Sequence, residues 1–182
     1  MPLPPTADRR FVELHTYWES RRRGCFAPAR PDIDPMDIPG LLPMVVLLDV
    51  VPGPDGAAAD FRFRLVGTWI DRLFGRPLTG TRLSEAQVRE LGGPALEACR
   101  SVVAGRCPVF ARFLMRLGRA GQDGRGGGQV EAVALLLPLS RDGRTVDMLM
   151  AGLTQRTDIP DAPPLSAMGG LLAGVDVSLQ PL

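Results

Sequence analysis

The sequence has a single histidine, His15, and only three cysteines, Cys25, Cys99 and Cys107. One histidine excludes a metal site built from several histidines, and a Ser/His/Asp triad would have to use His15 itself. An odd number of cysteines without CxxC spacing indicates neither a disulfide framework nor a zinc site. We therefore predict no metal site and no catalytic residue, and the residues identify no particular cofactor.

The sequence also lacks a long apolar run and an excess of charge of either sign. No stretch approaches the roughly 18 apolar residues that a membrane helix needs, and the first ten residues lack the apolar core of a signal peptide. The net charge is +1, so no global field attracts the chain to nucleic acid or anionic lipid. We therefore expect a cytoplasmic protein that binds neither nucleic acid nor membrane.

The N-terminal part predicts an amphipathic helix. Thr6 can cap it, and Phe11, Leu14 and Trp18 recur at i, i+3 and i+7, which places them on one face. This apolar face requires a cover. The Pro-bounded connector that follows predicts one helical turn after Asp34.

Five later segments have the composition of β-strands. Three are apolar at nearly every position, which is typical of strands buried on both faces, and two alternate apolar residues with arginine, which is typical of strands with one wet face. The apolar segments are Met44–Val51, Val130–Leu139 and Val146–Leu153. The alternating segments are Phe61–Leu65, with Arg62 and Arg64, and Cys107–Leu117, with Arg112 and Arg116.

Between the predicted strands Phe61–Leu65 and Cys107–Leu117, the spacing of apolar residues predicts helices. A short helix is expected over Thr68–Phe74, ended by Gly75. A longer helical segment is expected from about Ser84, with a break at Gly92-Gly93-Pro94 before its second half, which runs to Ala104.

This order of elements resembles the PAS fold. Particular strings strengthen the resemblance and are similar to a family of small stand-alone bacterial PAS-like proteins of unknown function. They run from Asp32-Ile33-Asp34-Pro35 through Asp49-Val50, then Phe61 to Thr68, Phe74 to Gly80, and Leu136-Leu137-Pro138-Leu139-Ser140. The resemblance covers roughly Tyr17 to Leu153.

The resemblance implies an α+β fold with a five-stranded antiparallel sheet in the order 2-1-5-4-3 and helices on one face. The two arginine-bearing strands would then lie at the two edges, where charged side chains discourage pairing with other molecules. We divide the chain into residues 1–30, the N-terminal amphipathic helix and connector, 31–154, the PAS-like domain, and 155–182, a Pro/Gly-rich extension. The extension is expected to contain at most one short helix, near residues 166–172.

The resemblance also implies a pocket between the sheet and the central helices. From helical spacing and strand parity we expect it to be apolar and suited to a small fatty or aromatic ligand. Its candidate lining residues are Trp69, Leu73, Phe74, Val103, Phe113, Met115, Val133, Leu135, Met148 and Met150. We interpret Cys99 and Cys107 as buried structural thiols, and His15 as a surface or interface residue rather than a haem ligand.

Strands that are apolar on both faces need cover on the second face as well. Phe11, Leu14 and Trp18 are candidates for this cover and for a dimer interface. The resulting hypothesis is a homodimeric sensory or regulatory module that binds a small apolar ligand or a protein partner and passes its signal to a separate signalling protein. Two alternatives stay open, namely a small enzyme with Asp49 or Glu131 as a buried general base, and a scaffold for protein association.

Overall fold

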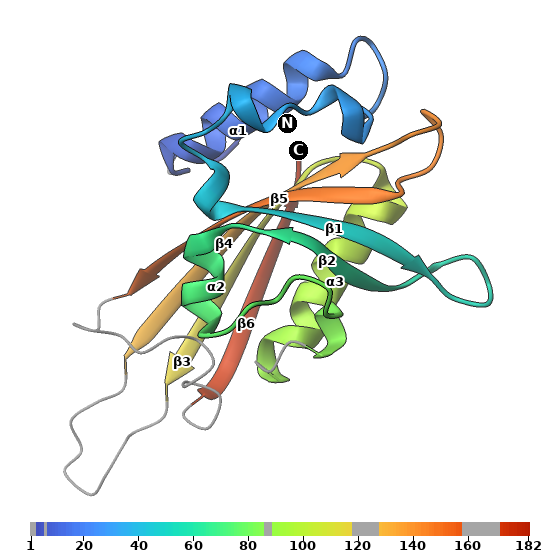
Figure 1. Cartoon of the computed structure of the whole chain (residues 1–182). Helices are drawn as coiled ribbons and strands as arrows, with labels where there is room; N and C mark the ends of the chain where they lie inside the picture. Colours follow the sequence, from blue (N-terminus) through green and yellow to red (C-terminus); the bar gives the residue numbers. More distant parts are fainter. Residues whose placement is uncertain (1–2, 6, 86–88, 118–127, 158–171) are drawn as a thin grey trace, which may run out of the picture.

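A computed structural model describes residues 3–5, 7–85, 89–117, 128–157 and 172–182 of the chain. Its elements form one six-stranded sheet with helices on both faces (Figure 1). Four single 3₁₀ turns, at Arg30–Asp32, Pro35–Asp37, Leu42–Met44 and Leu83–Glu85, connect the larger elements. The helices and strands are α1 (Arg9–Arg21), β1 (Val45–Pro52), β2 (Ala58–Val66), α2 (Thr68–Phe74), α3 (Arg89–Gly105), β3 (Val109–Leu117), β4 (Gln129–Leu139), β5 (Met148–Thr157) and β6 (Leu172–Pro181).

The strands pair antiparallel throughout in the order β2-β1-β5-β4-β3-β6. The α+β class, the five expected strands and their order 2-1-5-4-3 are confirmed. The extension contributes a sixth strand, β6, beside β3, so the expectation that β3 forms an edge is wrong. Most of the short helix expected near residues 166–172 lies outside the described residues, and Leu172 is the first residue of β6.

The arginines of β3 have a different role from the one expected of an edge strand. Arg112 Nε lies 2.7 Å from Glu131 Oε1 on β4, and Arg116 Nη1 lies 3.0 Å from Asp176 Oδ2 on β6. Each arginine therefore pairs with a carboxylate on a neighbouring strand of the same face, and such cross-strand pairs are compatible with an interior strand.

Helix α1 begins after Asp8, whose Oδ1 accepts a hydrogen bond from the Arg10 backbone N–H at 2.9 Å. Thr6, the expected cap, lies outside the described residues. The helix ends at Arg21, and the chain turns away through Arg23 and Gly24, both at positive φ. The turn expected after Asp34 is confirmed at Pro35–Asp37, where Asp34 Oδ1 accepts from the Met36 N–H.

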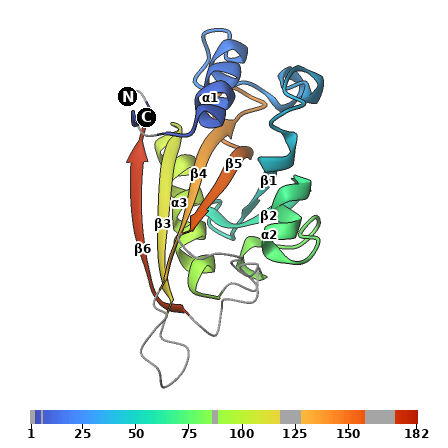
Figure 2. The ribbon, with the colours of Figure 1, turned by 90° about the vertical axis from the view of Figure 1, so that its left-hand side faces the viewer.

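Helix α1 covers one face of the sheet, which we call the outer face (Figure 2). Phe11, Leu14 and Trp18 are at most 1% exposed and pack on outer-face side chains of β1, β4 and β5. The Trp18 indole N–H donates to the Pro138 carbonyl at 2.8 Å. The amphipathic helix thus supplies within one chain the second cover that the apolar strands require.

Helices α2 and α3 cover the opposite face, which we call the inner face. The expected helix at Thr68–Phe74 is confirmed as α2 and ends at Gly75, whose φ is +69°. The expected break at Gly92-Gly93-Pro94 is wrong, because α3 runs through Pro94 to Gly105. Pro94 lies in the second turn, where its missing N–H removes one backbone hydrogen bond, while Ala98, Cys99 and Val102 are buried against the sheet.

The alternation expected in β2 holds for Phe61 and Phe63 but not for Leu65. The β1–β2 pairing shifts register between Leu47 and Leu48, so that Leu65 lies opposite Leu47, an outer-face residue. Leu65 is therefore 38% exposed instead of joining the inner core.

Candidate ligand cavity

A cavity of about 90 Å³ lies between the inner face of the sheet and helices α2 and α3. No polar atom contributes to its wall. It is larger than the roughly 30 Å³ that one water takes up in the liquid and smaller than the roughly 150 Å³ apolar cavity that admits benzene in another protein. The lining residues are Val46, Leu48, Phe63, Ile70, Phe74, Leu83, Ala95, Ala98, Cys99, Phe113, Ala134, Leu136, Ala151 and Leu153.

Small side chains on facing elements leave this space unfilled. Ala95 and Ala98 come from α3, whereas Ala134 and Ala151 come from β4 and β5. Larger side chains, among them Phe63, form the rest of the wall.

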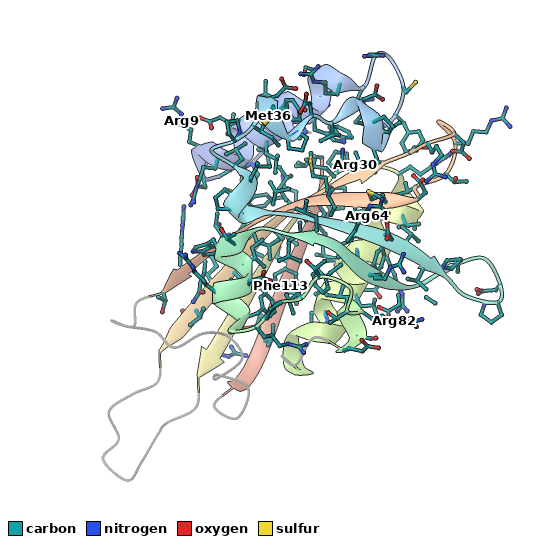
Figure 3. All side chains as sticks on the ribbon, in the orientation of Figure 1. Arg9, Arg30, Met36, Arg64, Arg82 and Phe113 are labelled. Atoms are coloured by element: carbon teal, nitrogen blue, oxygen red, sulfur yellow. The ribbon has the colours of Figure 1, made fainter. Side chains whose placement is uncertain are left out.

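The ten candidate pocket residues fall into three groups. Phe74 and Phe113 line the cavity, and Phe113 is labelled in Figure 3, where it projects from β3. Four others belong to the inner core without lining the cavity, and four lie on the outer face beneath α1 and away from it. The inner-core residues are Trp69, Leu73, Val103 and Met115, and the outer-face residues are Val133, Leu135, Met148 and Met150.

The misplaced residues come from β4 and β5, which are apolar on both faces. In β4 the residues of even number, such as Ala134 and Leu136, face the cavity, and in β5 Ala151 and Leu153 do. Where both faces of a strand are buried, the alternation of residues separates two faces. It does not show which face lies toward α2 and α3 and which toward α1. The selection of Val133 and Met150 for the pocket is corrected on this ground.

Four alanines of the wall, Ala95, Ala98, Ala134 and Ala151, were missed at the sequence level. The prediction of lining residues favoured large side chains, namely aromatic residues and methionine, whereas a cavity also forms where several small side chains face one another. The sequence shows these alanines, but for Ala134 and Ala151 it does not show which face of the sheet they occupy, because their strands are apolar on both faces.

Cys99 contributes the sulfur of the cavity wall. It is 3% exposed, and burial raises the pKa of its thiol to about 12. The neutral thiol therefore dominates at physiological pH, and the wall carries no charge from it. Cys99 acts here as a small polarisable apolar group.

The two carboxylates proposed as a general base lie away from the cavity. Asp49 projects from the outer face of β1 and forms salt bridges with Arg62, at 3.0 Å, and with Arg64. Glu131 also lies on the outer face and binds Arg112. Neither carboxylate contacts the space enclosed by α2 and α3.

His15 lies on α1, on the far side of the sheet from the cavity. Its ring stacks at a tilt on Trp18, with 5.9 Å between the ring centroids, and burial lowers its pKa below 6.5. Within the described ranges, no group of three or more His, Cys, Asp or Glu side chains is arranged to hold a metal ion.

The candidate dimer residues Phe11, Leu14 and Trp18 lie in the core of their own chain. Their side chains could reach a second chain only if α1 left its own sheet. Trp69 and Phe26 pack against both the inner and the outer core, so they connect the surroundings of the cavity to the residues beneath α1.

A family model described as a PAS domain matches residues 7–154. The match spans α1 to β5 and covers most of the chain, so the protein belongs to the PAS domain family. The comparisons with curated proteins and with solved structures gave no match. PAS domains in general are sensory or binding modules.

Every helix in the described part of the chain is too short or too polar to span a membrane.

Proposed function

We propose that this protein is a cytoplasmic sensory module whose signal is a small, uncharged, apolar molecule held in the cavity between the sheet and α2 and α3. This proposal rests on the cavity, which has a wholly apolar wall and a volume of about 90 Å³. A cavity larger than the space of one water and smaller than the roughly 150 Å³ cavity that admits benzene favours a molecule of few heavy atoms over a fatty chain or a large aromatic ligand. The chemistry of the wall offers no partner for a charged group.

The elements that form the cavity wall support the proposal that ligand binding changes how α2 and α3 pack on the sheet. Ile70 and Phe74 come from α2, a helix of seven residues, and Ala95, Ala98 and Cys99 come from α3. Filling the space adds contacts between these helices and the sheet, which favours the closely packed arrangement over looser ones. Trp69 on α2 also packs against the core beneath α1, so a shift of α2 reaches both faces of the sheet.

We further propose that the module acts as a homodimer and passes its signal to a separate signalling protein. Because α1 covers the outer face of its own sheet, we propose that a second copy binds at a surface other than Phe11, Leu14 and Trp18. This part of the proposal is independent of the cavity.

Xenon is a suitable first probe because it enters dry apolar cavities of this kind. We expect dissolved xenon to shift the methyl NMR signals of the cavity residues Val46, Leu136 and Leu153. The methyl signals of Leu137 and Leu139, on the outer face of the same sheet, serve as internal controls and should stay unchanged.

A matched pair of variants sharpens this test. Ala134→Val extends a cavity residue into the space, whereas Ala132→Val makes the same change two residues earlier on the same face without lining it. We expect the first variant to weaken xenon binding about tenfold or more and the second to leave it within about twofold. If the cavity methyl groups do not respond to xenon in the unmodified protein, the sensing proposal fails and an association scaffold becomes the better explanation.

A further inference from the structure

The two margins of the sheet differ in how their backbone groups are used. At the β2 margin, Phe63 N–H donates to Thr81 O at 3.0 Å and Gly80 N–H donates to Phe63 O at 2.7 Å. The Arg100 side chain binds the carbonyl oxygens of Ala58 and Ala59 at 3.0 and 2.7 Å. This margin is therefore already occupied by the chain itself.

At the β6 margin, the described part of the chain contributes no further strand. Figure 2 shows β6 at the side of the sheet, and among the residues that the structure describes no strand pairs with its outward edge. β6 lies outside the span 7–154 that matches the PAS family model. An open strand edge presents unpaired N–H and C=O groups that are able to bind another strand.

The backbone groups that point outward from β6 follow from its pairing with β3. Leu182 N–H donates to Pro108 O at 2.9 Å, and the register is regular from Pro181 back to Gly174. Because antiparallel residues alternate in direction, the residues of even number in β6 bond to β3. Val175, Val177 and Leu179 therefore direct their N–H and C=O groups away from the sheet.

We propose that this edge binds the same edge of a second copy of the chain, antiparallel and with the two-fold axis at Val177, so that the two sheets become continuous. The axis places Val177 opposite its counterpart and Val175 opposite Leu179 of the other copy. Each outward N–H and C=O of these three residues then finds a partner, as an isologous interface requires. This inference rests on the homodimer proposed above and names its surface.

Side chains favour this register over its neighbours. Val175 and Leu179 pack against the inner core, and Val177, which is 38% exposed, gains apolar cover from its counterpart on the same face. Asp176, held by Arg116 on the other face, lies opposite Ser178. An axis at Asp176 would place two aspartates opposite each other, and an axis at Ser178 would require an N–H from Pro181, which has none.

Variants of the full chain that introduce a positive or a negative charge at residue 177 test this interface. Val177→Lys and Val177→Asp each place like charges opposite each other across the axis, so each should weaken self-association about tenfold or more. An equimolar mixture of the two variants should restore association, because opposite charges then meet. Leu65→Lys is the matched control, since Leu65 is equally exposed, at 38%, but lies on β2 at the other margin.

Sedimentation velocity over a range of concentrations up to about 1 mM measures the association, with far-UV circular dichroism to confirm that each variant is folded. A Val177→Lys protein that associates like the unmodified chain would overturn this interface and leave the homodimer standing. A mixture of folded variants that stays monomeric also overturns it. An unmodified protein that is monomeric throughout removes both the interface and the homodimer, while the xenon test of the cavity is unaffected.

Discussion

The Cδ2 methyl group of Leu14 lies 2.7 Å from the position that a Cβ atom on residue 152 would take, and this residue is Gly152. Met44 Cε lies 3.1 Å from the same position. Real Cβ atoms essentially never come within 3.0 Å of another atom, so a side chain at residue 152 would force the Leu14 methyl group to shift from its place on β5. Gly152 thus leaves the space on the outer face that the Leu14 and Met44 side chains occupy.

Gly152→Ala is therefore expected to destabilise the protein by about 1–3 kcal/mol, because Leu14 and Met44 must shift in a closely packed core. Urea denaturation followed by circular dichroism measures the change in the free energy of unfolding. Gly40→Ala is the control, since no atom lies within 4 Å of the added Cβ and the φ angle is not positive. It should change stability by less than about 0.5 kcal/mol. Equal effects of the two variants would contradict the close approach of α1.

Trp18 holds α1 to the sheet through a polar contact as well as by packing. Its indole N–H binds the carbonyl of Pro138, which lies beyond the last β3–β4 pair at Val109 and Leu136. Trp18→Phe leaves that carbonyl buried without this donor and should cost about 1–3 kcal/mol, plus the loss of packing. Tyr17→Phe, which removes an exposed hydroxyl, should cost no more than about 1 kcal/mol in the same denaturation experiment. A smaller loss for Trp18 than for Tyr17 would contradict this role.

The sequence predicts the parts of the fold that rest on local patterns. The spacing of Phe11, Leu14 and Trp18 identifies α1, and the apolar run after Met44 identifies a central strand, because burial on one or two faces leaves a direct trace in the residues. Strand β6 leaves a weaker trace. Its Val175, Val177 and Leu179 alternate with polar residues, but it follows a Pro/Gly-rich stretch and forms through pairing with β3, which is a tertiary effect.

The lining of the cavity could be predicted from the sequence only in part, for a different reason. Phe74 and Phe113 could be predicted as lining residues because a helix position and a one-sided strand each define their direction. Ala134 and Ala151 could not, because their strands are apolar on both faces and the choice between faces depends on which helix packs where. The open space itself depends on several small side chains meeting in three dimensions.

Cys99 and Cys25 differ in how far solvent reaches their thiols. Cys99 is 3% exposed with a pKa of about 12, whereas Cys25 is exposed. At pH 8, on the order of one Cys99 in ten thousand is a thiolate, and the reactive form is the thiolate. In a chain with Cys25→Ser and Cys107→Ser, we expect a thiol reagent to label Cys99 at least about a hundredfold more slowly than in denaturant.

The matched chain retains Cys25 and carries Cys99→Ser and Cys107→Ser. It should react at nearly the same rate in the folded and unfolded states, which controls for the reagent and the buffer. Rapid labelling of Cys99 in the folded protein would show that the cavity wall opens to solvent.

His15 is the only histidine, so its titration can be isolated. Burial beside Trp18 lowers the pKa of His15 below 6.5 in the folded state, whereas Glu19 acts in the opposite direction. The unfolded chain therefore binds the proton more readily. Stability from this group is fully present above about pH 6.5 and is lost as the pH falls from there through the lower, folded pKa.

Urea denaturation at about pH 7 and pH 5.5 is expected to show a lower free energy of unfolding at the lower pH, and His15→Gln should reduce this difference. Glu19→Gln should enlarge it, because removing the carboxylate lowers the folded pKa of His15 further. These opposite signs separate the titration of His15 from a general effect of acid on the fold. An unchanged pH dependence in His15→Gln would mean that the ring keeps its ordinary affinity for the proton and that its contact with Trp18 leaves it open to water.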